Sequence, residues 1–186
     1  MNIGIDIDDT VTFTYETLLN LIALKYGMNF DKLISKKPTY DMFDSLFPNY
    51  RLFVHETFPV MAKMVPLKSD VVEILNKLHK QGHKIIFISA RNKEEYKDPY
   101  KLSYEYLKAN NVPFDKLIVD VKDKAKECVL QQIDLFIDDD LSNCKAVKNV
   151  GIETWQFSNV FTIPNNDLKI VKSWEDVYKK VQEMYI

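Results

Sequence analysis

Glycine is scarce in this chain of 186 residues, and its scarcity excludes two common ways of binding phosphate. Only Gly4, Gly27, Gly82 and Gly151 occur, so the sequence contains neither a G-x-G-x-x-G fingerprint nor a P-loop. A protein of this composition that handles phosphate must therefore use a metal ion, cationic side chains and a few backbone N–H groups.

Cysteine, net charge and long apolar runs are also limited. Cys128 and Cys144 have no paired metal-ligand spacing, and we expect both to be reduced packing residues. The formal net charge of -2 offers no basic field, so we expect no nucleic-acid polymer as a partner. The chain has no apolar run of about eighteen residues and no signal-peptide pattern. These absences lead us to expect a cytoplasmic monomer or homodimer with no membrane partner.

The N-terminus joins an apolar strand to a group of carboxylates. Ile3, Ile5 and Ile7 alternate along the chain, which predicts a buried strand. Asp6 and Asp8 are two residues apart, so in an extended chain they point to the same side. Two carboxylates at a buried strand end repel each other unless a proton or a cation lies between them. A hard divalent cation with oxygen ligands is the natural candidate.

The rest of the chain alternates between strand and helix patterns, which predicts an α/β fold with a doubly wound parallel sheet. Ser69 and Ser173 are the expected N-caps of two of the helices. A helical, aromatic stretch interrupts the alternation directly after the first strand. We therefore expect an α/β core of residues 1–12 and 67–186, with residues 13–66 inserted as a small helical cap. The further strands are expected at residues 84–89, 117–119, 134–138 and 152–157.

Polar residues stand at or near the predicted ends of several strands. Because the carboxyl ends of parallel strands meet at one edge of a sheet, we expect these side chains to lie together. A pair of acids, a hydroxyl, a lysine and a second pair of acids form a set suited to phosphoryl transfer. The residues concerned are Asp6, Asp8, Ser89, Ala90, Arg91, Lys124, Asp138 and Asp139.

The order of these residues resembles the four sequence motifs of the haloacid-dehalogenase (HAD) superfamily of phosphohydrolases, over nearly the whole chain. The early helical insertion and the segment ending in Asp138-Asp139 are most similar to the 5′(3′)-deoxyribonucleotidase branch. This resemblance implies a HAD-like Rossmannoid core and Mg²⁺-dependent hydrolysis of phosphomonoesters through an aspartyl-phosphate. The chain departs from that branch at two places: Ser89-Ala-Arg91 replaces Thr-Ser-Pro, and Asp140 replaces an arginine.

The resemblance also implies a role for each residue. Asp6 would be the nucleophile and Asp8 the general acid/base, with the Asp8 backbone carbonyl also bound to the metal. The other expected metal ligands are the Asp6, Asp138 and Asp139 side chains, with Asp139 favoured as the direct ligand of the second pair. Ser89, the Ala90 N–H and Lys124 would hold the phosphate. Arg91 belongs to a segment that departs from that branch, and its position alone predicts that it either binds phosphate or pairs with a carboxylate of the cap.

Several alternatives remain open at this stage. Lys122 and Lys126 compete with Lys124 for the phosphate. Phe13 and Phe43 of the insertion are candidates for contact with a substrate base. The expected partner is a small phosphorylated metabolite, with a nucleoside monophosphate favoured over a sugar phosphate or another phosphometabolite. A signalling receiver domain, with Asp120 as its phosphate acceptor, and a catalytically silent nucleotide-binding relative are the rival interpretations.

Overall fold

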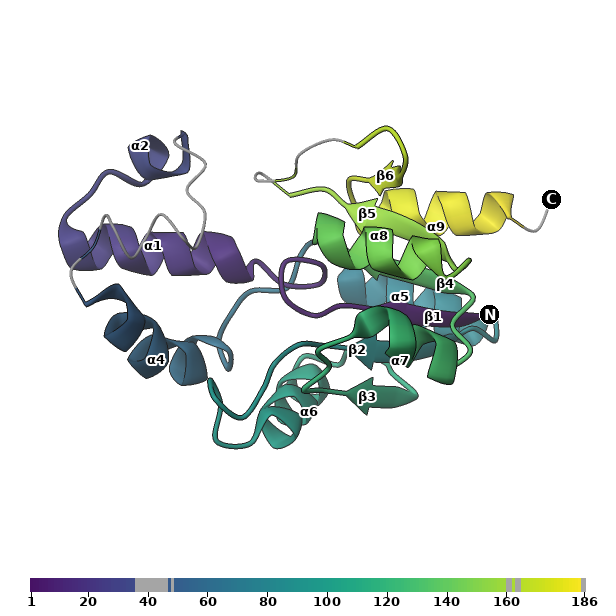
Figure 1. Ribbon diagram of the computed structural model, residues 1–186, viewed down its shortest axis with the longest axis horizontal. Coiled ribbons are helices and arrows are strands. Elements are labelled where there is room, and N and C mark those ends of the chain that lie inside the picture. The colour runs from purple at the N-terminus through teal and green to yellow at the C-terminus, as the bar shows by residue number, and fades with distance from the viewer. Residues whose placement is uncertain (36–46, 48, 160–161, 163–164, 185–186) are drawn as a thin grey trace.

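A six-stranded parallel sheet organises the chain, in the order β3-β2-β1-β4-β5-β6 (Figure 1). The computed structural model describes residues 1–35, 47, 49–159, 162 and 165–184. This sheet confirms the predicted doubly wound α/β fold. The strands are β1 (Asn2–Ile5), β2 (Lys84–Ile88), β3 (Lys116–Ile118), β4 (Leu135–Asp138), β5 (Glu153–Phe157) and β6 (Lys169–Val171).

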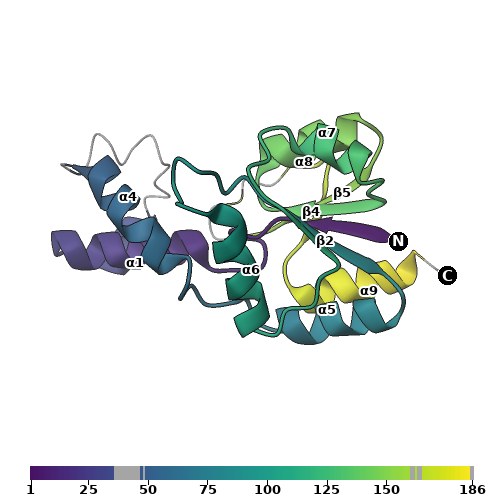
Figure 2. The same cartoon turned by 90° about the horizontal axis from the view of Figure 1, so that it is seen from below.

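Helices cover both faces of the sheet (Figure 2). One face packs against α5, α6 and α9 through a core that includes Leu75, Leu107 and Val177. The other face packs against α7 and α8 through Cys128 and Val147. Because both faces are buried, β1, β2 and β4 are almost continuously apolar, as expected for strands of a parallel sheet. These helices are α5 (Val71–Lys80), α6 (Pro99–Ala109), α7 (Lys124–Leu130), α8 (Leu141–Asn149) and α9 (Trp174–Glu183).

A separate group of helices follows β1 and lies beyond the carboxyl ends of the strands (Figure 1). It contains α1 (Thr14–Tyr26), α2 (Phe30–Ser35) and α4 (Tyr50–Met61), which bury an apolar cluster of their own. The two segments that connect this group to the sheet pair with each other through an antiparallel bridge between Thr12 and Leu67. That these helices form a cap over the site remains a prediction.

Local signals predicted most of the element boundaries. The Ser173 hydroxyl accepts a hydrogen bond from the Asp176 N–H at 3.1 Å, which confirms the predicted N-cap of α9. The prediction for Ser69 is wrong, because α5 starts after Asp70, whose φ of 64° lies in the left-handed region. The strand β6 was not predicted from the sequence. No helix in the described ranges is both long and apolar enough to cross a membrane.

Candidate active site

A pocket of about 430 Å³ lies at the carboxyl ends of β1, β2 and β4. In an open parallel sheet, ligands usually bind at the carboxyl ends of the strands, where neighbouring connections run to opposite faces of the sheet. The pocket brings together all eight of the residues that the sequence singled out, and seven of its lining residues carry a carboxylate. The lining consists of Asp6, Asp8, Asp9, Thr14, Phe58, Ser89, Ala90, Arg91, Asn92, Glu95, Tyr96, Lys124, Asp138, Asp139, Asp140 and Asn143.

Lys124 joins the two acidic segments of the pocket. Its ammonium donates to Asp6 Oδ1 at 2.6 Å and to Asp138 Oδ2 at 2.7 Å, and all three side chains are buried. Lys124 is the first residue of α7, where the Asp123 carboxylate caps the helix by accepting the Lys126 N–H. Lys122, one of the alternatives from the sequence, is exposed and lies outside the lining of this pocket.

Asp8 is held by a different set of partners. Arg91 donates to both of its carboxylate oxygens at 2.7 Å, through Nε and Nη2, and the Thr14 hydroxyl donates to Oδ1 at 2.7 Å. The Arg91 guanidinium is buried and also reaches the Ser103 hydroxyl at 3.3 Å. Burial raises the pKa of Asp8, but the charge and hydrogen bonds of Arg91 outweigh it and hold that pKa below its usual range. Among the residues that the structure describes, the acidic partner of Arg91 is therefore Asp8, which follows β1.

Ser89 and Ala90 turn the chain away from β2 toward the pocket. Ser89 is almost fully buried, and its hydroxyl accepts the Arg91 N–H at 3.3 Å. Its backbone bonds to β3 and to Val121 on either side, which fixes the position of the turn. Ala90 is exposed and lines the pocket. The predicted contact of both residues with phosphate stays a prediction.

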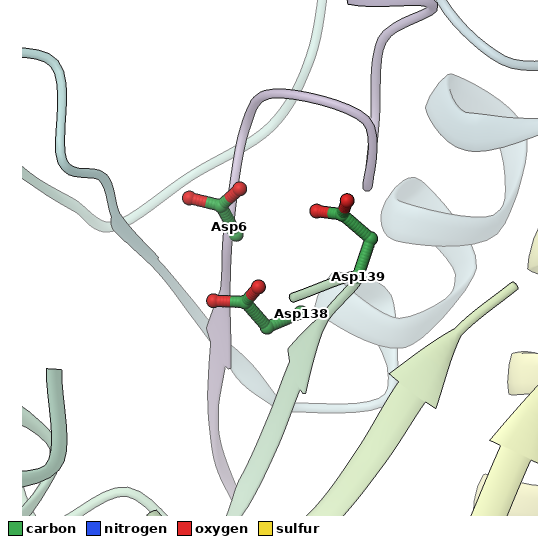
Figure 3. Close-up of side chains that lie close together, drawn as sticks. All are labelled: Asp6, Asp138 and Asp139. Carbon is green, nitrogen blue, oxygen red and sulfur yellow. The ribbon is translucent and has the colours of Figure 1, made fainter. Parts of the chain in front are cut away.

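Three carboxylates form a group that fits a divalent cation (Figure 3). One oxygen each from Asp6, Asp138 and Asp139 lies within 4.8 Å of the others. All donors are hard oxygens, which is the ligand type that Mg²⁺ prefers. Burial, opposed by Lys124 and reinforced by the neighbouring acids, raises the pKa of Asp6 to about 7, and burial also raises that of Asp139. The Asp8 side chain is not part of this group, so only its backbone carbonyl remains as a predicted ligand.

Side chains that the sequence did not single out hold these ligands in place. The Thr10 hydroxyl and the Asn159 amide donate to Asp139 at 3.3 and 3.1 Å, and the Asn143 amide donates to Asp138 at 3.2 Å. Such bonds orient a metal ligand and are part of many metal sites. Only Asn143 carried a signal, because it stands one helical turn after the acid pair.

The Asp140 departure from the nucleotidase branch has a structural explanation. Asp140 caps α8, where its carboxylate accepts the Asn143 N–H at 2.8 Å. Its own N–H donates to Asp138 Oδ1 at 2.8 Å, so the same residue also orients a metal-site carboxylate. An N-terminal carboxylate also suits the dipole of the helix that follows.

The aromatic candidates lie in different places. Phe58 of α4 and Tyr96 stack with ring centroids 6.4 Å apart and line the acidic pocket. Phe13 lines a neighbouring pocket instead, and Phe43 lies outside the described residues. Asp120, the acceptor in the receiver interpretation, is exposed and is not part of the acidic pocket.

The raised pKa of Asp6 leads to a prediction for the metal-free protein. A carboxyl group whose pKa is higher in the folded than in the unfolded state stabilises the fold below about pH 4 and loses that contribution as the pH rises to about 7. The test compares the melting temperatures of the wild type and Asp6→Asn in EDTA. The wild-type value minus the variant value should fall by several degrees between pH 5 and pH 7.5, and Mg²⁺ should reverse this fall. A difference that is the same at both pH values would contradict this electrostatic description.

Comparison with known proteins identifies the fold. No protein-family profile matches the chain. It is 23% identical over 188 residues to a Clostridium acetobutylicum protein named as a nucleotidase, covering 100% of this chain and 95% of the relative. It is 28% identical over 205 residues to a Bacillus cereus protein named "Putative nucleotidase", with coverage of 97% and 99%. The solved structure of a HAD phosphatase from Thermococcus onnurineus aligns with a TM-score of 0.60 at 16% identity, over 97% of both chains.

Proposed function

We propose that the chain is a Mg²⁺-dependent phosphomonoester hydrolase that acts on nucleoside monophosphates through an aspartyl-phosphate. It has the fold of HAD-superfamily hydrolases and is similar along its length to proteins named as nucleotidases. The observation that carries this proposal is the convergence of Asp6, Asp8 and Lys124 with the acids Asp138 and Asp139 in one pocket. Clustered charges of this kind are costly to bury without a task.

In the proposed reaction, a carboxylate oxygen of Asp6 attacks phosphorus, and the bond to the leaving alcohol breaks. Asp8 gives its proton to that alcohol, so the alcohol leaves neutral and Asp8 becomes a carboxylate. A water molecule then attacks the phosphorus of the aspartyl-phosphate while Asp8 removes its proton. Inorganic phosphate leaves, Asp6 is restored as a carboxylate, and Asp8 again carries a proton.

Charge neutralisation is the second requirement of the reaction. Lys124 already contacts the attacking carboxylate and supplies positive charge where the equatorial phosphate oxygens would lie. Asp6, Asp138 and Asp139 would hold Mg²⁺, which, when bound, neutralises the repulsion between carboxylate and phosphate. Ser89 and the Ala90 N–H would hold the remaining phosphate oxygens.

The contact with Arg91 affects the two roles of Asp8 differently, because it favours the base over the acid. An ionised Asp8 is ready to remove a proton from water, which is the second step. To donate a proton first, Asp8 must take one up against the charge of Arg91. We infer that the Arg91–Asp8 contact loosens when substrate binds, and that esters whose leaving groups need little protonation react most readily.

A panel of phosphorylated metabolites tests the proposed function. Nucleoside monophosphates should be hydrolysed faster than sugar phosphates at equal concentration, with Mg²⁺ present. The same reactions in EDTA should fall to background. A preference for sugar phosphates would support the hydrolase activity but contradict the proposed substrate class. Full activity in EDTA would contradict the metal-dependent mechanism.

The helices α1, α2 and α4 are proposed as a cap that selects the substrate. Thr14 and Phe58 are the described residues of these helices that line the acidic pocket, and the Phe58 ring stacks on Tyr96. Phe58→Ala should raise KM for a nucleoside monophosphate by about tenfold, because a contact with the leaving group is lost. Its effect on p-nitrophenyl phosphate should be smaller. Val60→Ala, at an exposed position of the same helix, is the matched control. Equal changes in KM for both substrates in Phe58→Ala would show that these helices do not select the substrate.

A further inference from the structure

A second pocket, of about 370 Å³, lies where the connecting segments of the helical group meet the sheet. It opens between the start of α1, the segment before α5, the end of β5 and the start of α9. We name it the Lys68 pocket. Its lining shares no residue with the acidic pocket and consists of Phe13, Glu16, Lys68, Ser69, Asp70, Phe157, Ser158, Asn159, Lys172, Ser173 and Trp174.

Lys68 is the unusual residue of this pocket. It is 9% exposed, and its ammonium lies 4.7 Å from the centroid of the Phe13 ring and 5.1 Å from that of Phe157. Within the described ranges its ammonium makes no hydrogen bond and no ion pair. Burial lowers the pKa of Lys68, although the charges of Asp9, Glu16 and Asp139 oppose this. Buried charges in proteins are almost always paired, so the donors of this ammonium suit a partner from outside the chain.

Further donors surround this ammonium. The hydroxyls of Ser69, Ser158 and Ser173 line the pocket, and the Ser173 hydroxyl accepts the Asp176 N–H, which leaves its own proton available to donate. The ten-residue helix α9 also begins there, and a helix start favours negative charge. Lys172 is exposed at the rim together with Asp70, while Glu16 is half-buried. The lining thus carries two lysines and two carboxylates, and Lys68 is its buried charge.

The pocket lies against the two paired connecting segments. The Phe13 N–H donates to the Pro66 carbonyl at 2.9 Å, and the Lys68 N–H donates to the Val11 carbonyl at 2.8 Å. We propose that the Lys68 pocket is a second anion site, separate from the acidic pocket, that takes the phosphate group of a small molecule. Its volume is within the range of small-ligand sites. A phosphate there would contact the connecting segments, β5 and α9 together. The proposal is independent of the proposed hydrolase activity.

Equilibrium dialysis with radiolabelled inorganic phosphate in EDTA tests this site. Without a divalent cation, the acidic pocket presents seven carboxylates against Arg91 and Lys124 and should repel phosphate. The wild type should nevertheless bind one phosphate per chain. Lys68→Met, which keeps the length of the side chain, should weaken this binding by at least about tenfold, and Lys68→Arg should retain it. Circular dichroism checks that each variant is folded.

Two further variants locate the bound phosphate. Lys172→Met, at the exposed rim, should weaken phosphate binding several-fold without disturbing packed residues. Lys169→Met removes a lysine that lies 4.9 Å over the Trp155 ring outside the pocket, and it should bind phosphate as the wild type does. The proposal is overturned if the wild type binds none, if the Lys68 and Lys172 variants both bind normally, or if Lys169→Met weakens binding as much as Lys68→Met does.

Discussion

Asp6→Asn should lose at least about 10⁴-fold in kcat toward every phosphomonoester, because the carboxamide cannot form the covalent intermediate. The loss should be the same for p-nitrophenyl phosphate, since no leaving group compensates for a missing nucleophile. Steady-state hydrolysis at saturating Mg²⁺ measures the effect. The variant should remain folded, because Asn keeps the size of Asp and removes a carboxyl group whose pKa burial raises to about 7.

Asp9→Asn is the matched control. Asp9 lies three residues along the same loop, is half-buried beside Asp8 and also has a pKa raised by burial to about 7. Its carboxylate accepts the Tyr15 N–H at 2.9 Å, which an amide oxygen can also do, and its φ of 58° suits asparagine. This variant should keep activity within about threefold of the wild type. A large loss in Asp9→Asn together with a small loss in Asp6→Asn would place the nucleophile elsewhere.

Lys124→Met should give the second largest effect, a fall of about 10²–10³-fold in kcat, because the positive charge nearest the transferring phosphoryl group is lost. It should also destabilise the metal-free protein by about 3–5 kcal/mol, since Asp6 and Asp138 are left buried and unpaired. Activity assays and urea unfolding in EDTA measure the two effects.

Lys122→Met tests whether the effect belongs to this position. Lys122 is exposed, two residues away, and should be replaceable with little change in activity or stability. Mg²⁺ should restore much of the stability of Lys124→Met but not its activity, because the cation can neutralise the acids without replacing the lysine at the phosphoryl oxygens. Wild-type turnover in Lys124→Met would remove this residue from the mechanism.

The sequence predicted the parts of the site that depend on strand order. Asp6, Ser89 and Asp138 follow apolar runs, and parallel strands bring such ends to one edge of the sheet. The preference for Lys124 over Lys122 rested on its place at the start of a capped helix, and the structure puts that ammonium on Asp6.

Contacts between distant segments were not predictable in this way. Arg91 and Asp8 are 83 residues apart, and their bidentate contact depends on how the chain turns after β2. The burial of Lys68 is a similar case, because nothing in a connecting segment signals that two aromatic rings from different elements will enclose a lysine. Side-chain partners of this kind are set by tertiary packing rather than by local pattern.

The most direct test of the proposed mechanism is the location of the phosphoryl group on the enzyme. Asp8→Asn keeps the nucleophile but lacks the base for the second step, which typically contributes about 10²–10⁴-fold. With p-nitrophenyl phosphate, which needs little protonation to react, its aspartyl-phosphate should accumulate. Rapid quenching followed by mass spectrometry should find phosphate on Asp6 in Asp8→Asn and none in Asp6→Asn. Phosphate on Asp120 or Asp138 instead would contradict the assignment of Asp6 as the nucleophile.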